Sequence, residues 1–158
     1  MNINITLKYL SVLFFLWVAP VISAIWGAPI WVTVSFMCFF AIYGGHEWTH
    51  VYICHMHGIY VESVNLISGR ETHILFEPAT GENKNKIESD IYLAGAAWDT
   101  IFFSIAIFNA IFYGFVQKDN TPVVFATSLI FLLIFNLAME GSDWQEFSKR
   151  TLKRAKRA

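Results

Sequence analysis

The sequence predicts an all-α membrane protein with about four transmembrane helices and a small β-hairpin between the second and third helices. The composition is the first reason: of 158 residues, 56% are hydrophobic and only 15% are charged, which is unusual for a soluble domain. The second reason is that four segments are long and apolar enough to cross a hydrocarbon core, which takes about 20 residues of helix. We therefore expect one polytopic membrane domain, residues 1–158.

The expected spanning helices cover residues 8–27, 30–56, 90–116 and 121–147. The first begins at Lys8 and contains the motif VISA, so it also fits a secretory signal peptide that is cleaved after Ala24. We expect a retained helix, because the apolar run continues through Ile25 and Trp26 without a polar break.

The segment between the second and third spans predicts a β-hairpin over residues 60–77. The stretches IYVESVNLIS and THILFE are short and rich in β-branched and aromatic residues, and Gly69 and Arg70 separate them. The polar stretch PATGENKNKIES then returns the chain to the membrane.

Basic residues indicate the orientation of the chain. They crowd the C-terminal tail, residues 148–158, as Lys149, Arg150, Lys153, Arg154, Lys156 and Arg157. An excess of Lys and Arg marks the cytoplasmic side of a membrane protein. With four spans, the N-terminus and the 58–89 connection are expected on the same side. The tail suits anionic lipid headgroups, and we expect no nucleic-acid partner.

The motif HEWTH, residues 46–50, is the strongest chemical signal in the chain. His46 and His50 are four residues apart, so on a helix both imidazoles lie on one face and reach a single ion. Glu47 projects beside them, where a carboxylate takes a proton from an activated water in the zinc hydrolase signature H-E-x-x-H. A charge at mid-bilayer costs about 2.5–3.5 kcal/mol on the insertion scale. This cost favours a functional site over histidines that only hydrogen-bond a neighbouring helix.

Catalytic zinc usually takes three protein ligands and one water, so another ligand has to come from a different helix. Counting about 1.5 Å per residue from the helix ends places Asp99 and Asp143 in the same, cytoplasmic leaflet as His46. Glu140 is the rival of Asp143 as third ligand, and an interfacial residue without metal is the other interpretation of Asp143. His57 lies near the helical face of His46, where it either guides water or metal or is a plain interfacial histidine.

These motifs resemble those of the site-2 protease family of intramembrane zinc metalloproteases, over roughly residues 40–145. GGHEWTH matches the family's H-E-x-x-H helix, and IYVESVNLISG is similar to the strand that follows it. AGAAWD is similar to the family's G-P-x-x-N element, with Ala96 in place of proline and Asp99 in place of asparagine. NLAMEGSD is similar to the last element, N-x-x-P with Asp-Gly, although Met139 replaces the proline and Trp144 the glycine.

The resemblance implies that His46, His50 and Asp143 bind Zn²⁺ and that Glu47 is the general base. The implied substrate is a transmembrane protein in the lipid bilayer, cleaved at a peptide bond in or near its membrane span. Asp99 stands where the family's asparagine orients substrate or stabilises the oxyanion. A protonated Asp99 would donate the same hydrogen bond, and a role as fourth zinc ligand is the alternative. We also expect an unwound substrate segment to add as a strand to the exposed edge of the hairpin.

Two other classes of protein fit parts of the sequence. A catalytically degenerate protein that binds membrane helices would explain Asp99 and the altered last motif. A membrane di-iron oxygenase also gathers histidines at helix ends, but the chain has only five histidines and no HxxHH box. Metal content separates these classes: zinc for a protease, two irons for an oxygenase and no metal for a helix-binding protein.

Overall fold

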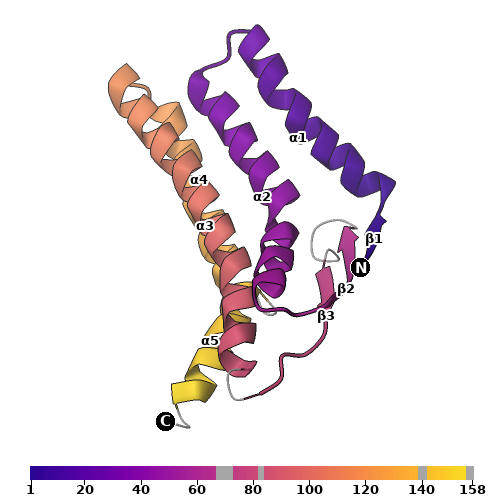
Figure 1. Ribbon diagram of the computed structural model, residues 1–158. Helices are drawn as coiled ribbons and strands as arrows, with labels where there is room; N and C mark the ends of the chain where they lie inside the picture. The colour runs from indigo at the N-terminus through magenta and orange to yellow at the C-terminus, as the bar shows by residue number, and fades with distance from the viewer. Residues whose placement is uncertain (67–72, 82–83, 139–141, 156–158) are drawn as a thin grey trace.

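The computed structural model describes residues 1–66, 73–81, 84–138 and 142–155. Within these residues the helices are α1 (Leu7–Ile25), α2 (Ile30–Met56), α3 (Lys84–Gln117), α4 (Asn120–Ala138) and α5 (Asp143–Ala155), and the strands are β1 (Asn2–Ile5), β2 (Val61–Leu66) and β3 (His73–Phe76). In Figure 1, α1 to α4 form an elongated bundle, and the sheet and α5 lie toward the end at which both chain termini are found. The expected, mostly helical class is confirmed.

Three of the described helices, α1, α3 and α4, are long and apolar enough to cross a membrane. Helix α2 has 27 residues and coincides with the second expected span, but its C-terminal half carries the polar groups of the HEWTH motif. These helices indicate a membrane protein. The count of four spans and the cytoplasmic location of the termini stay predictions.

Glycines in the left-handed conformation end two of the helices. Gly27 has a φ of 70° and follows α1, and Gly58 has a φ of 67° and follows α2. After α2, the N–H of Ile59 donates to the carbonyl of Cys54 at 2.9 Å, and that of Gly58 to His55 at 3.0 Å. These bonds satisfy carbonyls that the end of the helix leaves open, and they turn the chain toward β2.

The turn between α3 and α4 is closed by a side-chain cap. The backbone N–H of Thr121 donates to Oδ1 of Asp119 at 2.9 Å, which occupies one of the free donors in the first turn of α4. This hydrogen bond holds the pKa of the Asp119 carboxyl below its ordinary value. Helices α3 and α4 therefore run back along each other after a very short connection.

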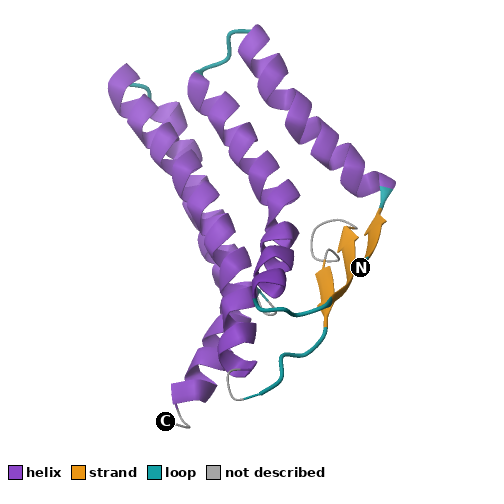
Figure 2. Ribbon diagram, viewed as in Figure 1, coloured by secondary structure: helices purple, strands orange, loops and turns teal. Residues whose placement is uncertain are grey.

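The small sheet has the order β1-β2-β3 (Figure 2). Strands β2 and β3 are antiparallel, with Val61 opposite Phe76 and a register shift between Val61 and Ser63. The expected turn with Gly69 and Arg70 lies outside the described residues. Strand β1, which the sequence analysis does not predict, pairs parallel to β2, with Ile5 opposite Leu66. Four residues give no reliable strand signal when their partner lies about 60 positions away.

The expected fourth span, residues 121–147, is wrong in its C-terminal part. Helix α4 ends at Ala138, and Asp143 begins a separate helix. Ser142 caps that helix: its carbonyl accepts the N–H of Glu146 at 3.0 Å, and its hydroxyl accepts that of Gln145 at 3.4 Å. Helix α5 is amphipathic and rich in charge, so it cannot continue an apolar span. The expected third span, residues 90–116, lies inside the longer helix α3.

Two apolar cores hold the bundle together. The first joins the sheet to the helices and has Tyr9, Cys54, Val61, Val64, Leu66 and Ile91 as its buried members. The second lies between α2, α3 and α4 and contains Cys38, Phe103, Ala106 and Leu129. The histidines of the site described below lie on α2 at positions between these two cores, and its third residue comes from α5.

Replacing Leu66 by alanine tests the contribution of the sheet. Leu66 is 2% exposed in the first core, so Leu66→Ala is expected to destabilise the fold by about 2–5 kcal/mol, visible as a lower Tm in detergent. Leu75→Ala is the matched control, because Leu75 in the same sheet is 49% exposed. An equal Tm for the parent and Leu66→Ala would show that the sheet does not stabilise the bundle.

Candidate metal centre

Helix α2 presents two histidine side chains from successive turns. The spacing of four residues brings the Nε2 atoms of His46 and His50 to 3.3 Å from each other. His50 is 4% exposed, while the His46 side chain is 25% exposed. The pair therefore lies at the inner face of α2, with His50 deeper in the protein.

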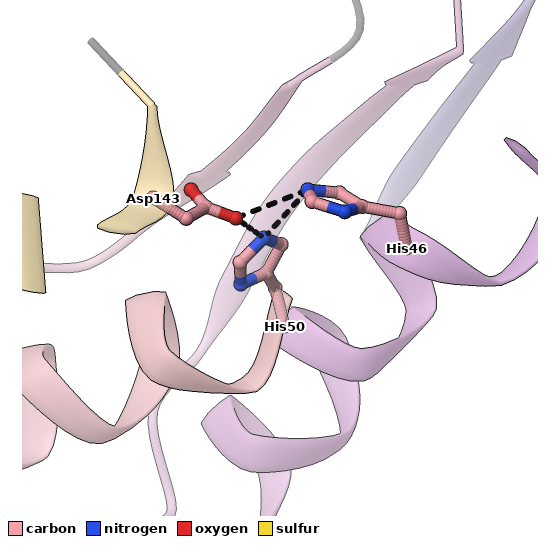
Figure 3. Close-up of side chains that lie close together, drawn as sticks. All are labelled: His46, His50 and Asp143. Carbon is pink, nitrogen blue, oxygen red and sulfur yellow. Dashed lines mark hydrogen bonds and ion pairs between the residues drawn. The ribbon is translucent and has the colours of Figure 1, made fainter. Parts of the chain in front are cut away.

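Asp143 meets this pair from α5. Its Oδ2 atom lies 3.0 Å from Nε2 of His46 and 2.9 Å from Nε2 of His50. Figure 3 shows the three side chains pointing toward one another. Because Asp143 is the first residue of α5, its position depends on how that helix docks.

The docking of α5 depends on the N-terminal part of α3. Arg150 forms an ion pair with Glu88, and its guanidinium lies 5.0 Å from the ring centroid of Tyr92, in cation–π contact. The hydroxyls of Ser89 and Thr151 add a hydrogen bond of 3.4 Å. These contacts direct the start of α5 toward the histidines.

Helix α3 also provides the space in which the three ligand side chains meet. A Cβ atom at Gly95 would contact Oδ2 of Asp143 and would lie 2.5 Å from both Cε1 and Nε2 of His50. Any side chain at this position would therefore displace the carboxylate or the imidazole. The small-residue stretch of the third expected span thus serves the site as well as helix packing.

Each imidazole makes a hydrogen bond through Nδ1, the ring nitrogen that does not face Asp143. Nδ1 of His50 lies 2.7 Å from the carbonyl oxygen of Ile91, and Nδ1 of His46 lies 2.9 Å from Oδ1 of Asp99. A carbonyl or a carboxylate only accepts, so each Nδ1 carries the hydrogen of the neutral ring. Each Nε2 then directs a lone pair toward the space shared with Asp143.

The three groups could hold a metal ion. Their ligand atoms all lie within 4.8 Å of one another. Oδ2 of Asp143 is buried without a hydrogen bond of good geometry, although it lies close to two ring nitrogens. Three electron-rich atoms directed at one point favour positive charge there, as a cation or as added protons, and two imidazoles with a carboxylate are a suitable ligand set for a first-row transition metal.

The structure brings His46, His50, Asp143 and Asp99 together, whereas Glu47 is placed near them by its position in the chain, next to His46. His46, His50 and Asp143 form the cluster. Asp99, 7% exposed, contacts the opposite nitrogen of His46. Glu47 is 9% exposed on α2, as a neighbour of His46 in the chain.

Two of the alternative residues lie elsewhere or outside the described structure. Nε2 of His57 lies 3.6 Å from Oδ2 of Asp90, so its described partner is not one of the clustered residues. The rival ligand Glu140 lies outside the described residues. Helix α4 contributes Asn136, the first residue of the NLAMEGSD motif, which donates from Nδ2 to Oδ2 of Asp99 at 3.2 Å.

An apolar groove of about 460 Å³ lies between α2 and α3. Its lining residues are Gly45, Trp48, Thr49, Tyr52 and Ile53 of α2, and Ala94, Ala97, Trp98 and Ile101 of α3. Trp98 forms one wall, fixed by a hydrogen bond of 2.8 Å from Nε1 to the carbonyl of Ala41. The groove therefore follows the two helices that carry His46, His50 and Asp99.

Comparison of the chain with models of protein families, with curated proteins and with solved structures finds no match.

Replacing Gly95 by alanine tests the geometry of the cluster. The added methyl group would push Asp143 away from His50, so metal binding is expected to weaken by roughly tenfold or more, the range seen when groups around a metal ligand are displaced. Metal analysis of the purified protein and titration with zinc measure this loss.

Gly114→Ala is the matched control on the same helix. A Cβ at Gly114 would lie 2.8 Å from the carbonyl oxygen of Asp119 and from Cγ2 of Val123, far along α3 from the histidines. It should lower Tm without changing metal affinity. If Gly95→Ala and the parent bind metal with equal affinity, Gly95 does not provide the space in which His46, His50 and Asp143 bind a metal ion.

Proposed function

We propose that this chain is an intramembrane zinc metalloprotease of the site-2 protease type, which hydrolyses a peptide bond in or near the transmembrane segment of a membrane protein. The observation that carries the proposal is the meeting of His46, His50 and Asp143, in a chain that also has three long, apolar candidate spans. Two histidines and an acid leave one position of a tetrahedral zinc free for reaction, which is typical of catalytic zinc.

The distances support zinc as the metal. Ligand atoms about 2.0–2.1 Å from a tetrahedral zinc ion lie about 3.3 Å from one another. The separations here are 2.9, 3.0 and 3.3 Å. An ion of this size therefore fits with shifts of a few tenths of an ångström in side chains that already point inward.

In this mechanism the residues of the chain have separate roles. Zinc, when bound, would lower the pKa of a water to about 7 and polarise the scissile carbonyl. His46, His50 and Asp143 hold the ion. Glu47 accepts the proton of the attacking water and delivers it to the leaving amine. The burial of His50 and Asp99 keeps bulk water from one side of the reacting groups.

An apolar peptide segment suits the surroundings of the site. The α2–α3 groove is lined almost entirely by apolar surface, so it would accept the apolar side chains of a substrate segment. A helix hides its own peptide bonds, so the substrate has to unwind before it is cut. We propose that the site lies in the cytoplasmic leaflet, on the side of the basic tail.

Replacing Glu47 by glutamine separates catalysis from metal binding. Glutamine has the shape of glutamate but takes up no proton, so cleavage of a transmembrane peptide by Glu47→Gln should fall by about 100-fold or more. The parent and the variant should both retain about one zinc ion per chain, and Asp143→Ala should lose it.

The outcomes of this experiment also separate the alternative classes. Equal cleavage by the parent and Glu47→Gln would refute the assigned base. Two irons per chain would indicate an oxygenase. A parent without metal would indicate a helix-binding protein in which protons occupy the space between His46, His50 and Asp143.

The edge of the sheet offers a second test of the substrate. Among the described strands, β1 covers one side of β2 and β3 the other, so the outer edge of β3 is open to a further strand. We propose that an unwound substrate pairs with this edge. Proline at Ile74 or at Leu75 removes one backbone donor of β3. Neighbouring N–H groups of a strand point to opposite edges, so one of the two variants loses a donor at the open edge of β3. That variant should cleave the substrate more slowly while its metal content stays unchanged. Full activity in both variants would exclude strand addition.

A further inference from the structure

Asp99 is a carboxylate in an apolar helix, and it is not one of the three clustered residues that could hold a metal ion. Only 7% of Asp99 is exposed, in a helix long and apolar enough to cross a membrane. A carboxylate in such a place is costly unless hydrogen bonds compensate it. Both of its oxygens have a partner: Oδ1 lies 2.9 Å from Nδ1 of His46, and Oδ2 accepts from Asn136 at 3.2 Å.

These contacts form a chain across three helices. Asn136 on α4 donates to Asp99 on α3, and Asp99 accepts from His46 on α2. The opposite nitrogen of His46 faces Asp143 at 3.0 Å. Asp99 therefore lies behind the ligand, on the far side of the ring from the metal position.

The two histidines differ in the group behind them. The carbonyl of Ile91 accepts from His50 and is neutral, whereas the carboxylate of Asp99 accepts from His46 and is charged. A carboxylate behind a ligand histidine fixes the ring orientation and makes Nε2 a stronger donor to a cation. His46 is also the more exposed of the two rings, so it has fewer packing contacts to hold it.

We infer that Asp99, held in place by Asn136, is a positioning residue that locks His46 into its metal-binding tautomer and sets the metal affinity of the site. This inference rests on the proposed metal site. It assigns to Asp99 a role different from the oxyanion or substrate contact that the resemblance implies, because both oxygens already accept hydrogen bonds within the protein.

Metal titration of the purified protein in detergent tests the inference without any substrate. The metal is first removed with a chelator, and zinc is then titrated in competition with a chromogenic chelator. Asp99→Ala should raise the Kd for zinc by about 10–100-fold. Asp99→Asn keeps the shape and a neutral acceptor, similar to the carbonyl behind His50, so it should raise the Kd less than Asp99→Ala does.

The Co²⁺-substituted protein gives a second readout. The visible absorption of Co²⁺ reports the geometry of its ligands, so Asp99→Ala should shift the spectrum, while Asp99→Asn should stay close to the parent. Asn136→Ala should change the Kd in the same direction by a smaller factor. Asp99→Asn retains the volume of the side chain and keeps the test valid where Asp99→Ala fails to fold.

Ser35→Ala is the matched control. Ser35 is 3% exposed on the same helix as His46, and its hydroxyl donates to the carbonyl of Trp31. It should leave the Kd and the spectrum unchanged. Equal zinc affinity in the parent, Asp99→Ala and Asp99→Asn would overturn the inference, and so would an equal loss in Ser35→Ala.

The same measurements separate this inference from the proposed protease. If the parent binds no zinc or Co²⁺, both proposals are wrong. If the parent binds zinc, Asp99→Ala weakens it and no peptide is cleaved, the positioning role is supported and the protease activity is refuted.

Discussion

The carboxylate of Asp143 lies between two imidazoles of α2, and the surrounding structure is arranged so that these three groups share one small volume. Acceptors already occupy both Nδ1 atoms, so lone pairs remain on the two Nε2 atoms beside the carboxylate. Electron-rich atoms at such distances repel one another strongly in a medium of low dielectric constant. The arrangement therefore requires positive charge, as a metal ion or as added protons. The proposed zinc site meets this requirement with a single ion and leaves no acceptor unsatisfied.

One face of α3 carries the supports of this arrangement. The supporting positions are Glu88, Tyr92, Gly95 and Asp99, which recur at intervals of three or four residues and so lie along one stripe of the helix. Glu88 and Tyr92 contact Arg150 of α5. Gly95 leaves room for the ligands, and Asp99 accepts a hydrogen bond from His46. The ligands themselves come from α2 and α5. Helix α3 thus acts as the template on which the site is assembled, although it supplies none of the three clustered ligand atoms.

The sequence predicted the local parts of this structure better than the distant ones. The pairing of His46 with His50 follows from helix geometry over four residues. The expectation that Asp143 lies near them came from counting along a fourth span to residue 147, and the structure has no such continuous helix, because α4 ends at Ala138 and Asp143 begins α5. Strand β1 could not be foreseen, because its stability comes from pairing with β2 and not from its own four residues. The break between α4 and α5 was missed although its cap is local: the N–H of Gln145 donates to the hydroxyl of Ser142 three residues before it, a pattern that the sequence SDWQ contains. The docking of Arg150 on Glu88 is a tertiary contact, which no local pattern predicts. Likewise, the hydrogen bonds of Asp99 with His46 and Asn136 depend on the packing of three helices, which local sequence patterns do not predict.

The division of the ligands between α2 and α5 couples the site to the fold. Asp143 reaches the histidines only when α5 is docked on α3, so binding of a cation and docking of α5 favour each other by linkage. The contacts of Arg150 hold the helix by its middle, while the carboxylate holds it by its first residue. With neither a cation nor added protons, that first residue would bring negative charge to two neutral rings with no compensating donor. The cluster is therefore both the proposed reactive centre and one of the points that fix α5 to the bundle.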